Sequence, residues 1–259
     1  MAQILYSERQ IAMIREAGRI TAECLEVIRK LAVPGSSTLA MDQAVGELIA
    51  RYKAKSPFLG YAFPGKKPFP ANLCASVNEC VVHGVPNDEE LEEGDLVSID
   101  VGVSLNGYIG DSAWTFPIGE PDPAAKRLLV AGEEALWAGI EAAKPRGKIN
   151  DIATAVQTLV EGRGYSVVRE FVGHGVGMAL HEEPQVPNYV DAKSTAIMMN
   201  KTLKPGMVIA IEPMVNEGKA EVESKDNTWP VLTKDGSRSV HFEHTVAIMG
   251  DRIEIMTLP

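Results

Sequence analysis

The sequence predicts an α+β fold made of two similar halves that face each other, with a site between them. Two observations support this prediction. The order helix, proline-containing break, helix, strands occurs twice along the 259 residues, and residue types that bind metals lie in apolar segments of both halves. With 45% hydrophobic residues, the chain can bury a large core. We therefore expect a single domain over residues 1–259, with halves at about 7–120 and 121–257.

Two helices and a loop open the first half. Ser7 is a suitable N-cap for a helix over 7–32, and Gln10 completes a capping-box pattern. The run VPGSST ends that helix, and a second helix follows at about 39–54. Residues 55–70 contain four prolines, which predicts a loop rather than a core element.

Strands complete the first half. Strand-like runs cover 72–82 and 95–104. The pair Asn106-Gly107 is a strong hairpin-turn signal, so we expect a return strand over about 108–116.

The second half repeats this order. A helix is predicted over 122–143, the run KPRGKIN breaks it, and another helix follows over 151–162. Identity between the halves is weak, so the repeat rests on the order of elements. Strand-like runs then follow at 165–172, 207–215, 229–233 and 240–256.

Composition narrows the class of protein. The net charge is −10 and no basic stripe occurs, which argues against nucleic acid and anionic membranes as partners. The three cysteines form no C-x-x-C pair, so we expect neither a disulfide framework nor a structural zinc site. The polar start MAQILYSERQ does not look like a signal peptide, and no run of about 18 apolar residues predicts a membrane helix. We expect a cytoplasmic protein.

The predicted hairpin brings two carboxylates together. If the turn has two residues, Leu105 faces Tyr108 and Gly102 faces Asp111. Asp100 then lies on the same face as Gly102, as a diagonal neighbour of Asp111. A one-residue slip would send the two side chains to opposite faces. Without a cation this pair of charges would destabilise the hairpin.

Five residues are predicted to form one metal site. Each lies in a short, mostly apolar segment, where an unpaired carboxylate is rare. Two divalent cations would balance the four carboxylates, and such a site is typical of metal-assisted hydrolysis. Mixed carboxylate and imidazole ligands suit Mn, Fe, Co or Zn. The five residues are Asp100, Asp111, His174, Glu212 and Glu243.

Other histidines are candidates for roles around the metals. His83 follows a strand and could donate a hydrogen bond to a scissile amide. His181 comes seven residues after His174, which favours a substrate contact over direct ligation. His241 and His244 flank Glu243, and we interpret them as outer or structural groups. Glu212 could both bind metal and pass on a proton.

Seven motifs in order resemble one family. They are NECVVHGVP, SIDVG, GDSAWTF, GHGVG, HEEP, AIEPM and FEHT, and the resemblance that they carry covers nearly the whole chain, from about residue 7 to 257. The chain resembles methionine aminopeptidase, more narrowly the short bacterial form (type I). The resemblance implies the pita-bread fold: two pseudo-symmetric αβ halves around a central cleft with two metals. No Cys-rich extension is seen, and thirty residues between His181 and Glu212 leave no room for the type II insertion.

The resemblance also implies roles for individual residues. The five predicted ligands match the family's ligands, with Asp111 and Glu243 bridging the metals. His83 and His181 match the two histidines that contact the substrate, and Asn78 matches a position near a monovalent-cation site. Phe58 stands where a cysteine is common, and the loop 64–72 looks longer than usual. The pocket for the methionine side chain would be formed by Tyr61, Phe63, Cys74, Leu180 and Trp229.

The implied activity is removal of the initiator methionine from nascent polypeptides, with a small second residue preferred. Transient contact with the ribosome and a monomeric state are further expectations. Two alternatives stay open. One is an Xaa-Pro aminopeptidase or dipeptidase of the same fold, although those usually carry an N-terminal domain for which residues 1–70 leave no room. The other is a non-catalytic binding protein on this scaffold, such as a ribosome- or growth-linked adaptor, although such relatives generally lose metal ligands.

Overall fold

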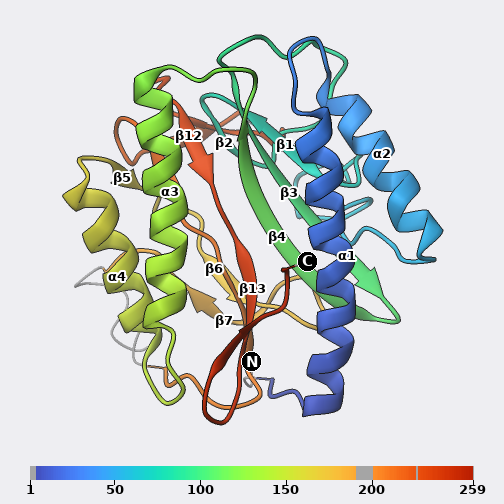
Figure 1. Cartoon of the computed structure of the whole chain (residues 1–259), viewed down its shortest axis with the longest axis vertical. Helices are drawn as coiled ribbons and strands as arrows, with labels where there is room; N and C mark the ends of the chain where they lie inside the picture. Colours follow the sequence, from blue (N-terminus) through green and yellow to red (C-terminus); the bar gives the residue numbers. More distant parts are fainter. Residues whose placement is uncertain (1–3, 191–200, 226, 259) are drawn as a thin grey trace.

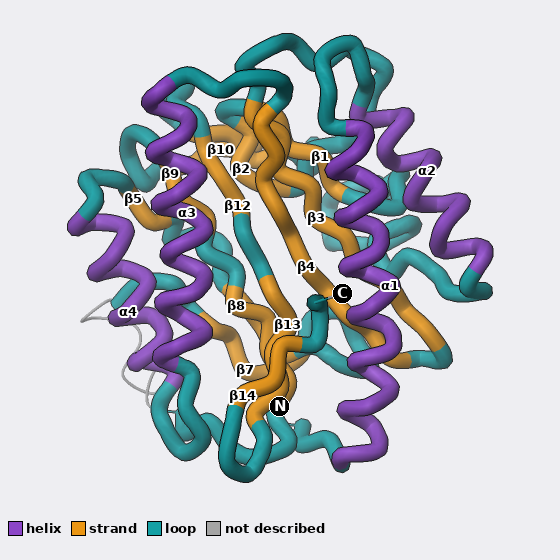
Figure 2. The backbone as a smooth tube through the Cα atoms, viewed as in Figure 1, coloured by secondary structure: helices purple, strands orange, loops and turns teal. Residues whose placement is uncertain are grey.

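Helices and strands form two layers in this protein. The computed structural model describes residues 4–190, 201–225 and 227–258. Within these ranges the four helices lie together on one side of the strands, as two pairs, with the carboxyl-terminal segment between the pairs (Figure 1). The tube view shows long strands running behind the gap between α1 and α3 (Figure 2). This arrangement is the α+β class that the sequence predicts.

The first helix pair covers the first sheet. Helix α1 (Glu8–Leu31) begins after Ser7, which forms the predicted capping box with Gln10, and α2 (Thr38–Arg51) follows a short break. Their apolar faces pack with the strands into one buried core. These helices therefore form one wall behind the strands that carry Asp100 and Asp111.

Two long strands dominate the first sheet. Strands β3 (Leu96–Leu105) and β4 (Tyr108–Pro117) form an antiparallel hairpin, and β1 (Cys74–Val77) pairs with the other edge of β3. Asn106 and Gly107 both have positive φ, at 52° and 83°, as the two central residues of a type I′ turn require. The prediction of one strand over 72–82 is wrong in one respect. In the structure the strand ends before Asn78, whose φ is 51°, and the chain continues as β2 (Cys80–Val82) in another sheet.

The second half has its own helix pair and core. Helices α3 (Pro123–Ala142) and α4 (Ile149–Gly162) pack with the later strands around buried Leu136, Ile152 and Phe242. The later strands are β5 (Ser166–Val167), β6 (Gly173–Gly175), β7 (Glu182–Val186), β8 (Val208–Ile211), β9 (Met214–Asn216), β10 (Val222–Ser224), β11 (Val231–Thr233), β12 (Ser239–His241), β13 (His244–Ile248) and β14 (Ile253–Ile255).

The long strands predicted in the second half are in fact broken. The run at 207–215 divides into β8 and β9, and the run at 240–256 divides into β12, β13 and β14. Strands β8 and β13 pair in a sheet of order β14-β13-β8-β6-β7, whereas β9 and β12 pair in a sheet of order β12-β9-β5. The chain therefore changes sheet at both breaks, and the breaks lie side by side. Most of the predicted strand at 165–172 is likewise irregular, and β7 and β10 are strands that the sequence did not predict.

Side-chain hydroxyls join the two halves. Thr245 Oγ1 accepts from the Asp111 N–H at 3.0 Å and donates to the Asp111 carbonyl at 2.7 Å. Thr115 Oγ1 likewise accepts from the His241 N–H and donates to the His241 carbonyl, at 2.9 Å each. The backbone N–H of Glu243 donates to the Ala113 carbonyl at 2.8 Å. These hydrogen bonds hold strand β4 against the segment of the second half in which β12 ends and β13 begins.

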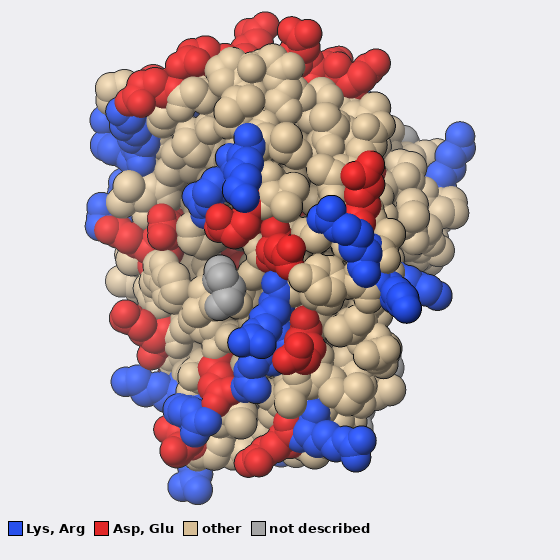
Figure 3. Space-filling view, turned by 45° about the vertical axis from the view of Figure 1, so that its right-hand side comes forward, with Lys and Arg blue, Asp and Glu red and all other residues tan. Residues whose placement is uncertain are grey.

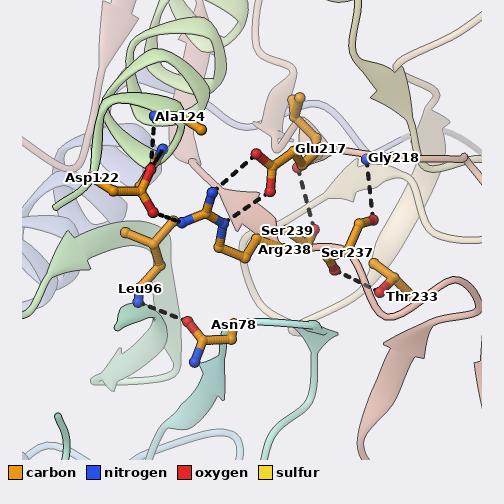
Figure 4. Close-up of polar contacts among 12 residues, drawn as sticks. Asn78, Leu96, Asp122, Ala124, Glu217, Gly218, Thr233, Ser237, Arg238 and Ser239 are labelled. Carbon is orange, nitrogen blue, oxygen red and sulfur yellow. Dashed lines mark hydrogen bonds and ion pairs between the residues drawn. The ribbon is translucent and has the colours of Figure 1, made fainter. Parts of the chain in front are cut away.

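An arginine ties one end of the paired strands β9 and β12 to α3. The Arg238 guanidinium contacts Glu217 through two nitrogens, at 2.9 and 3.0 Å, and donates to Asp122 at 2.6 Å (Figure 4). Asp122 is also the N-cap of α3 and accepts from the N–H groups of Ala124 and Ala125. These hydrogen bonds lower the pKa of Asp122 to about 2, with the Arg238 bond as the largest cause.

The surface carries charges of both signs. On the face in Figure 3, acidic side chains gather along the top edge, and basic side chains are spread among acidic ones lower down. None of the described helices is long and apolar enough to cross a membrane.

Candidate metal and substrate site

The hairpin presents Asp100 and Asp111 as the sequence predicts. Leu105 lies opposite Tyr108 and Gly102 lies opposite Asp111, so the predicted register is confirmed. Asp100 lies opposite Ala113 on β4 and opposite Cys74 on β1. Both carboxyl groups line a single large cavity on the strands. Gly102 leaves space for the Asp111 carboxylate, because a Cβ there would lie 3.3 Å from Asp111 Oδ1 and 2.8 Å from Pro57 Cγ.

Glu212 and Glu243 occupy the two breaks where the chain changes sheet. Glu212 separates β8 from β9, and Glu243 precedes β13 after β12 has ended. At a break the backbone carbonyl has no partner in a strand ladder, so another group must bond it. Asn188 Nδ2 donates to the Glu212 carbonyl at 2.9 Å, and Ser112 Oγ donates to the Glu243 carbonyl at 2.6 Å. Buried side chains thus fix the backbone that carries both glutamates.

His174 is held with one ring nitrogen facing the carboxylates. Its Nδ1 lies 2.9 Å from the Gly175 carbonyl, which can only accept, so Nδ1 carries the proton and Nε2 the lone pair. Nε2 lies 3.3 Å from Glu212 Oε1 and 4.0 Å from Asp111 Oδ2. The flanking Gly173 and Gly175 are required, because a Cβ at either would lie about 2.5 Å or less from a backbone carbonyl oxygen.

Burial dominates the electrostatics of this cluster. It raises the pKa of Asp100 well above its usual value, and the neighbouring Asp111 raises it further. Burial also raises the pKa of Asp111 to about 7. The pKa values of Glu212 and Glu243 are likewise raised well above normal, first by burial and then by the other carboxylates. Burial lowers the pKa of His174 to about 3, so its ring is neutral at neutral pH.

Divalent cations fit this set of donors. One oxygen of each of the four carboxylates, together with His241 Nε2, is buried and has no hydrogen-bond partner among the described residues. Such atoms are costly unless something pairs with them. Among the described residues, two groups hold ligand atoms within 4.8 Å of one another: Asp111 with His174 and Glu243, and Glu212 with His241 and Glu243. Both groups share Glu243, as a residue between two cations would.

His241 lies closer to this cluster than the sequence suggested. Its Nε2 is 3.6 Å from Glu212 Oε2, and its side chain is buried and lines the cavity. Asp100 lies outside both three-residue groups, although its Oδ1 is also buried and unpaired. His244, by contrast, bonds Thr257 Oγ1 at 2.8 Å through Nδ1 and does not line the cavity. His241 and His244 had the same interpretation in sequence because both flank Glu243, but in the structure only His241 lines the cavity.

The carboxylates lie in a cavity of about 860 Å³. This volume is in the upper part of the range of about 300–1,000 Å³ for sites that hold a drug-sized ligand. An apolar region adjoins the carboxylates, so the cavity has a charged part and an apolar part. The apolar and aromatic lining includes Phe58, Tyr61, Phe69, Cys74, Leu180 and Trp229.

Two further histidines line the same cavity. The His83 ring packs edge-on against Phe171, with centroids 5.3 Å apart, and its pKa is lowered to about 4, mainly by burial. His83 has a φ of 60°, in a region that residues other than glycine seldom adopt and that is often kept at functional sites. His181 Nδ1 lies 2.8 Å from the Tyr61 hydroxyl, and burial lowers its pKa as well.

Phe63 and Phe69 differ in position. Phe63, which the resemblance places in the pocket, lines the cavity but leaves 54% of its surface exposed. Phe69 is buried and packs edge-on against Trp229, with centroids 5.3 Å apart. Neither Phe69 nor Phe171 was predicted from the sequence to line the site. Of the three phenylalanines in the proline-rich loop, Phe63 and Phe69 looked equal in sequence, because only the folded loop shows which ring is buried.

Asn78 is engaged by the protein itself. Its Nδ2 donates to Asp95 at 2.8 Å, and its Oδ1 accepts from the Leu96 N–H at 3.0 Å. Its backbone carbonyl accepts from the Ser239 N–H at 2.9 Å. Figure 4 shows Asn78 beside Leu96, near the Arg238 contacts. The monovalent-cation site near Asn78 stays a prediction.

Comparison with known proteins identifies the family. Residues 12–249 match the family model described as metallopeptidase family M24. The chain belongs to metallopeptidase family M24. Methionine aminopeptidase 1 of Bacillus subtilis is 45% identical over 254 residues, which cover 98% of this chain and 98% of that protein.

Solved structures share the fold. The crystal structure of methionine aminopeptidase from Thermotoga maritima has a TM-score of 0.92 at 38% identity and covers 100% of both chains. A prolidase from Pyrococcus furiosus has a TM-score of 0.75 at 23% identity, covering 99% of this chain and 66% of that one. The second likeness shows the fold alone. The predicted pita-bread fold, with two αβ halves around a central cleft, is thereby confirmed.

Proposed function

We propose that this M24 protein is a metal-dependent aminopeptidase that removes the initiator methionine from polypeptides. One observation carries the proposal: four carboxylates, each with one buried oxygen that has no hydrogen-bond partner among the described residues, share a cavity with an apolar pocket. The charged part suits two divalent cations, and the apolar pocket suits an unbranched thioether side chain. The name of the relatives, including Methionine aminopeptidase 1 of Bacillus subtilis, supports methionine as the residue removed.

The residues that hold the cations in this proposal are those predicted from the sequence. Asp100, Asp111, His174, Glu212 and Glu243 would hold the two ions. His241 Nε2 lies 3.6 Å from Glu212 Oε2. In this proposal His241 either orients the Glu212 carboxylate or serves as a further metal ligand. When bound, divalent cations supply a polarised carbonyl and water that is more acidic than bulk water. Mn, Fe, Co and Zn all suit these ligands.

The protein's own groups bind the peptide and move protons. Glu212 accepts a proton from the attacking water and passes it to the leaving amine. The neutral rings of His83 and His181 each keep one N–H donor. The Tyr61 hydroxyl donates to His181 Nδ1, which places the ring proton on Nε2 for the scissile carbonyl. His83, held against Phe171, donates to the scissile amide. Phe58, Phe69, Cys74, Leu180 and Trp229 surround the side chain and exclude water, with Tyr61 and Phe63 at its edge.

Further parts of the proposal concern the substrate and its place. A small second residue is favoured, because the carboxylates and histidines crowd the place where it would lie. The substrates are nascent chains, so we place the protein in the cytoplasm, as a monomer in transient contact with ribosomes. The whole chain, residues 1–259, acts as one domain with halves that divide near residue 120.

The test is peptide hydrolysis by metal-stripped full-length protein, with Mn, Fe(II), Co or Zn added back. Met-Ala-Ser, Leu-Ala-Ser and Ala-Pro-Ser are compared at equal concentration. We expect release of methionine from Met-Ala-Ser only when metal is present. Release of alanine from Ala-Pro-Ser instead would support the Xaa-Pro alternative. Folded protein with no hydrolysis under any metal would support a binding protein.

A further inference from the structure

Three apolar side chains form a rim at the mouth of the cavity. We call Ile4, Phe63 and Met178 the apolar rim. All three line the cavity, yet 44%, 54% and 60% of their surfaces are exposed to solvent. They come from three separate segments: the amino-terminal stretch, the proline-rich loop and the turn after β6. Exposed apolar side chains that converge on a cavity mark a surface that a ligand covers.

Hydrogen bonds fix the position of Met178. Its backbone N–H donates to the Tyr6 hydroxyl at 2.9 Å and to Glu182 Oε1 at 3.0 Å. The Tyr6 hydroxyl donates in turn to the Glu182 carboxylate at 2.8 Å. Tyr6 is buried and follows Ile4 closely in the chain, so these bonds hold two of the three rim segments together.

The loop that carries Phe63 is also fixed. The Phe69 N–H donates to the Tyr61 carbonyl at 2.9 Å, and the Lys66 N–H donates to the Phe63 carbonyl at 3.0 Å. Trp229 Nε1 donates to the Lys67 carbonyl at 2.9 Å, which joins the loop to the pocket wall. The rim is therefore presented on backbone that is already ordered, which reduces the entropy lost on binding.

We propose that the apolar rim binds the third or fourth residue of the substrate polypeptide and makes the protein prefer large apolar side chains there. This inference rests on the proposed function. An exopeptidase holds the terminal residue deep in its site, so the rest of the chain must leave through the mouth. The proposed function places the first residue in the apolar pocket and the second beside the carboxylates and histidines, so in an extended peptide the third and fourth residues are the next to reach the mouth.

The size of the effect follows from the area covered. Partial burial of one leucine or phenylalanine side chain contributes enough free energy to change affinity about tenfold. Binding at the rim acts on the ground state and the transition state alike, so the preference belongs mainly in KM.

The experiment compares Met-Ala-Ser-Ser-Gly, Met-Ala-Leu-Ser-Gly and Met-Ala-Ser-Leu-Gly with the Mn-loaded full chain. We expect kcat/KM to be about tenfold higher for one of the leucine peptides than for the serine peptide. In the double variant Ile4→Ser, Met178→Ser this ratio should fall toward one. The ratio of kcat/KM between a leucine peptide and the serine peptide is taken within each variant. A purely structural defect lowers the hydrolysis of all peptides equally, so it leaves this ratio unchanged.

Leu59 provides a matched control. It belongs to the same proline-rich loop and is 56% exposed, but it does not line the cavity. Leu59→Ser should keep the full leucine preference. A fall of the same size in this variant would contradict a specific role for the rim.

Three results would overturn the inference. Methionine release that is equal for all three peptides means that the aminopeptidase proposal stands and the rim proposal fails. No methionine release from any peptide means that both fail. Self-association in sedimentation at assay concentration, abolished by Met178→Ser, would assign the rim to a second copy of the chain instead.

Discussion

The two halves supply acidic residues to one cavity in different ways. In the first half Asp100 and Asp111 come from an unbroken antiparallel hairpin, paired residue by residue from Leu96 to Pro117. In the second half Glu212 and Glu243 sit where strands break and change sheet. A hairpin positions its side chains through the ladder itself. A break needs partners from elsewhere, here Asn188, Ser112 and the hydroxyl groups around β4.

The largest expected effect comes from removing one carboxylate from each region. If both regions serve one centre, Asp111→Asn and Glu212→Gln should each lower methionine release more than 100-fold. Loss of an outer partner alone typically lowers metal affinity or activity about 10–100-fold, and loss of a ligand or proton carrier should exceed that. Release is measured with saturating Mn(II), and bound metal is measured by mass spectrometry.

The control for these variants is Glu133→Gln. Glu133 is an exposed residue of helix α3, so this variant should keep activity within about twofold. Normal turnover in Glu212→Gln, with metal still bound, would remove the proton-transfer role. Normal turnover in Asp111→Asn would separate the hairpin from the centre.

The second largest effect tests whether buried side chains hold the backbone in place where the strands break. Asn188 is fully buried and donates to the Glu212 carbonyl. Asn188→Ala leaves that carbonyl unpaired, so we expect a loss of about 1–3 kcal/mol in unfolding free energy and about 10–100-fold in activity. Urea unfolding and methionine release measure the two. The Asn150 amide bonds Thr154 on the surface of α4, so Asn150→Ala should change neither quantity by much. Full activity in Asn188→Ala would mean that the break holds its geometry unaided.

The third effect tests the hairpin in the same way. Asn106 has a left-handed conformation, which costs an ordinary residue about 1–2 kcal/mol. Asn106→Ala should therefore lower the unfolding free energy by about 1 kcal/mol while activity per folded molecule stays the same, because the ladder keeps the register. Asn106→Gly should restore most of the stability. A fall in specific activity for the alanine variant would show that the turn, rather than the ladder, positions Asp100 and Asp111.

The smallest effect concerns Arg238, which secures the strand leading to the Glu243 break. The pKa of Asp122 is about 2 in the folded protein, below its ordinary value of about 3.9. Its contribution to stability is thus fully present above about pH 4 and is lost as the pH falls toward 2. Wild type and Asp122→Asn should differ by a constant amount in urea midpoint at neutral pH, and this difference should shrink between pH 4 and 2. A difference that is independent of pH would contradict the ion pair's role.

This contrast also explains what the sequence could predict. The register of the hairpin followed from a two-residue turn and a period of two, and the structure has the same pairing. The helices followed from capping and apolar spacing, as at Ser7. These signals are local, so they can be read without knowing the partners.

The breaks could not be predicted, because their causes are remote in sequence. The apolar runs around Glu212 and Glu243 look like continuous strands, and only pairing with different sheets divides them. The position of His241 beside Glu212 and the inward turn of Phe69 depend on the same packing. Residue type indicated the chemistry of the site, whereas tertiary contacts decided which neighbours joined it.

The most direct test of a shared centre is a calorimetric titration of metal-stripped full-length protein with Mn(II), with methionine release from Met-Ala-Ser measured on the same samples. We predict two Mn(II) ions per chain, with activity that rises as they bind, and fewer than two in both Asp100→Asn and Glu243→Gln. Full methionine release from protein without metal, or unchanged binding in both variants, would contradict a centre built jointly by the hairpin and the breaks.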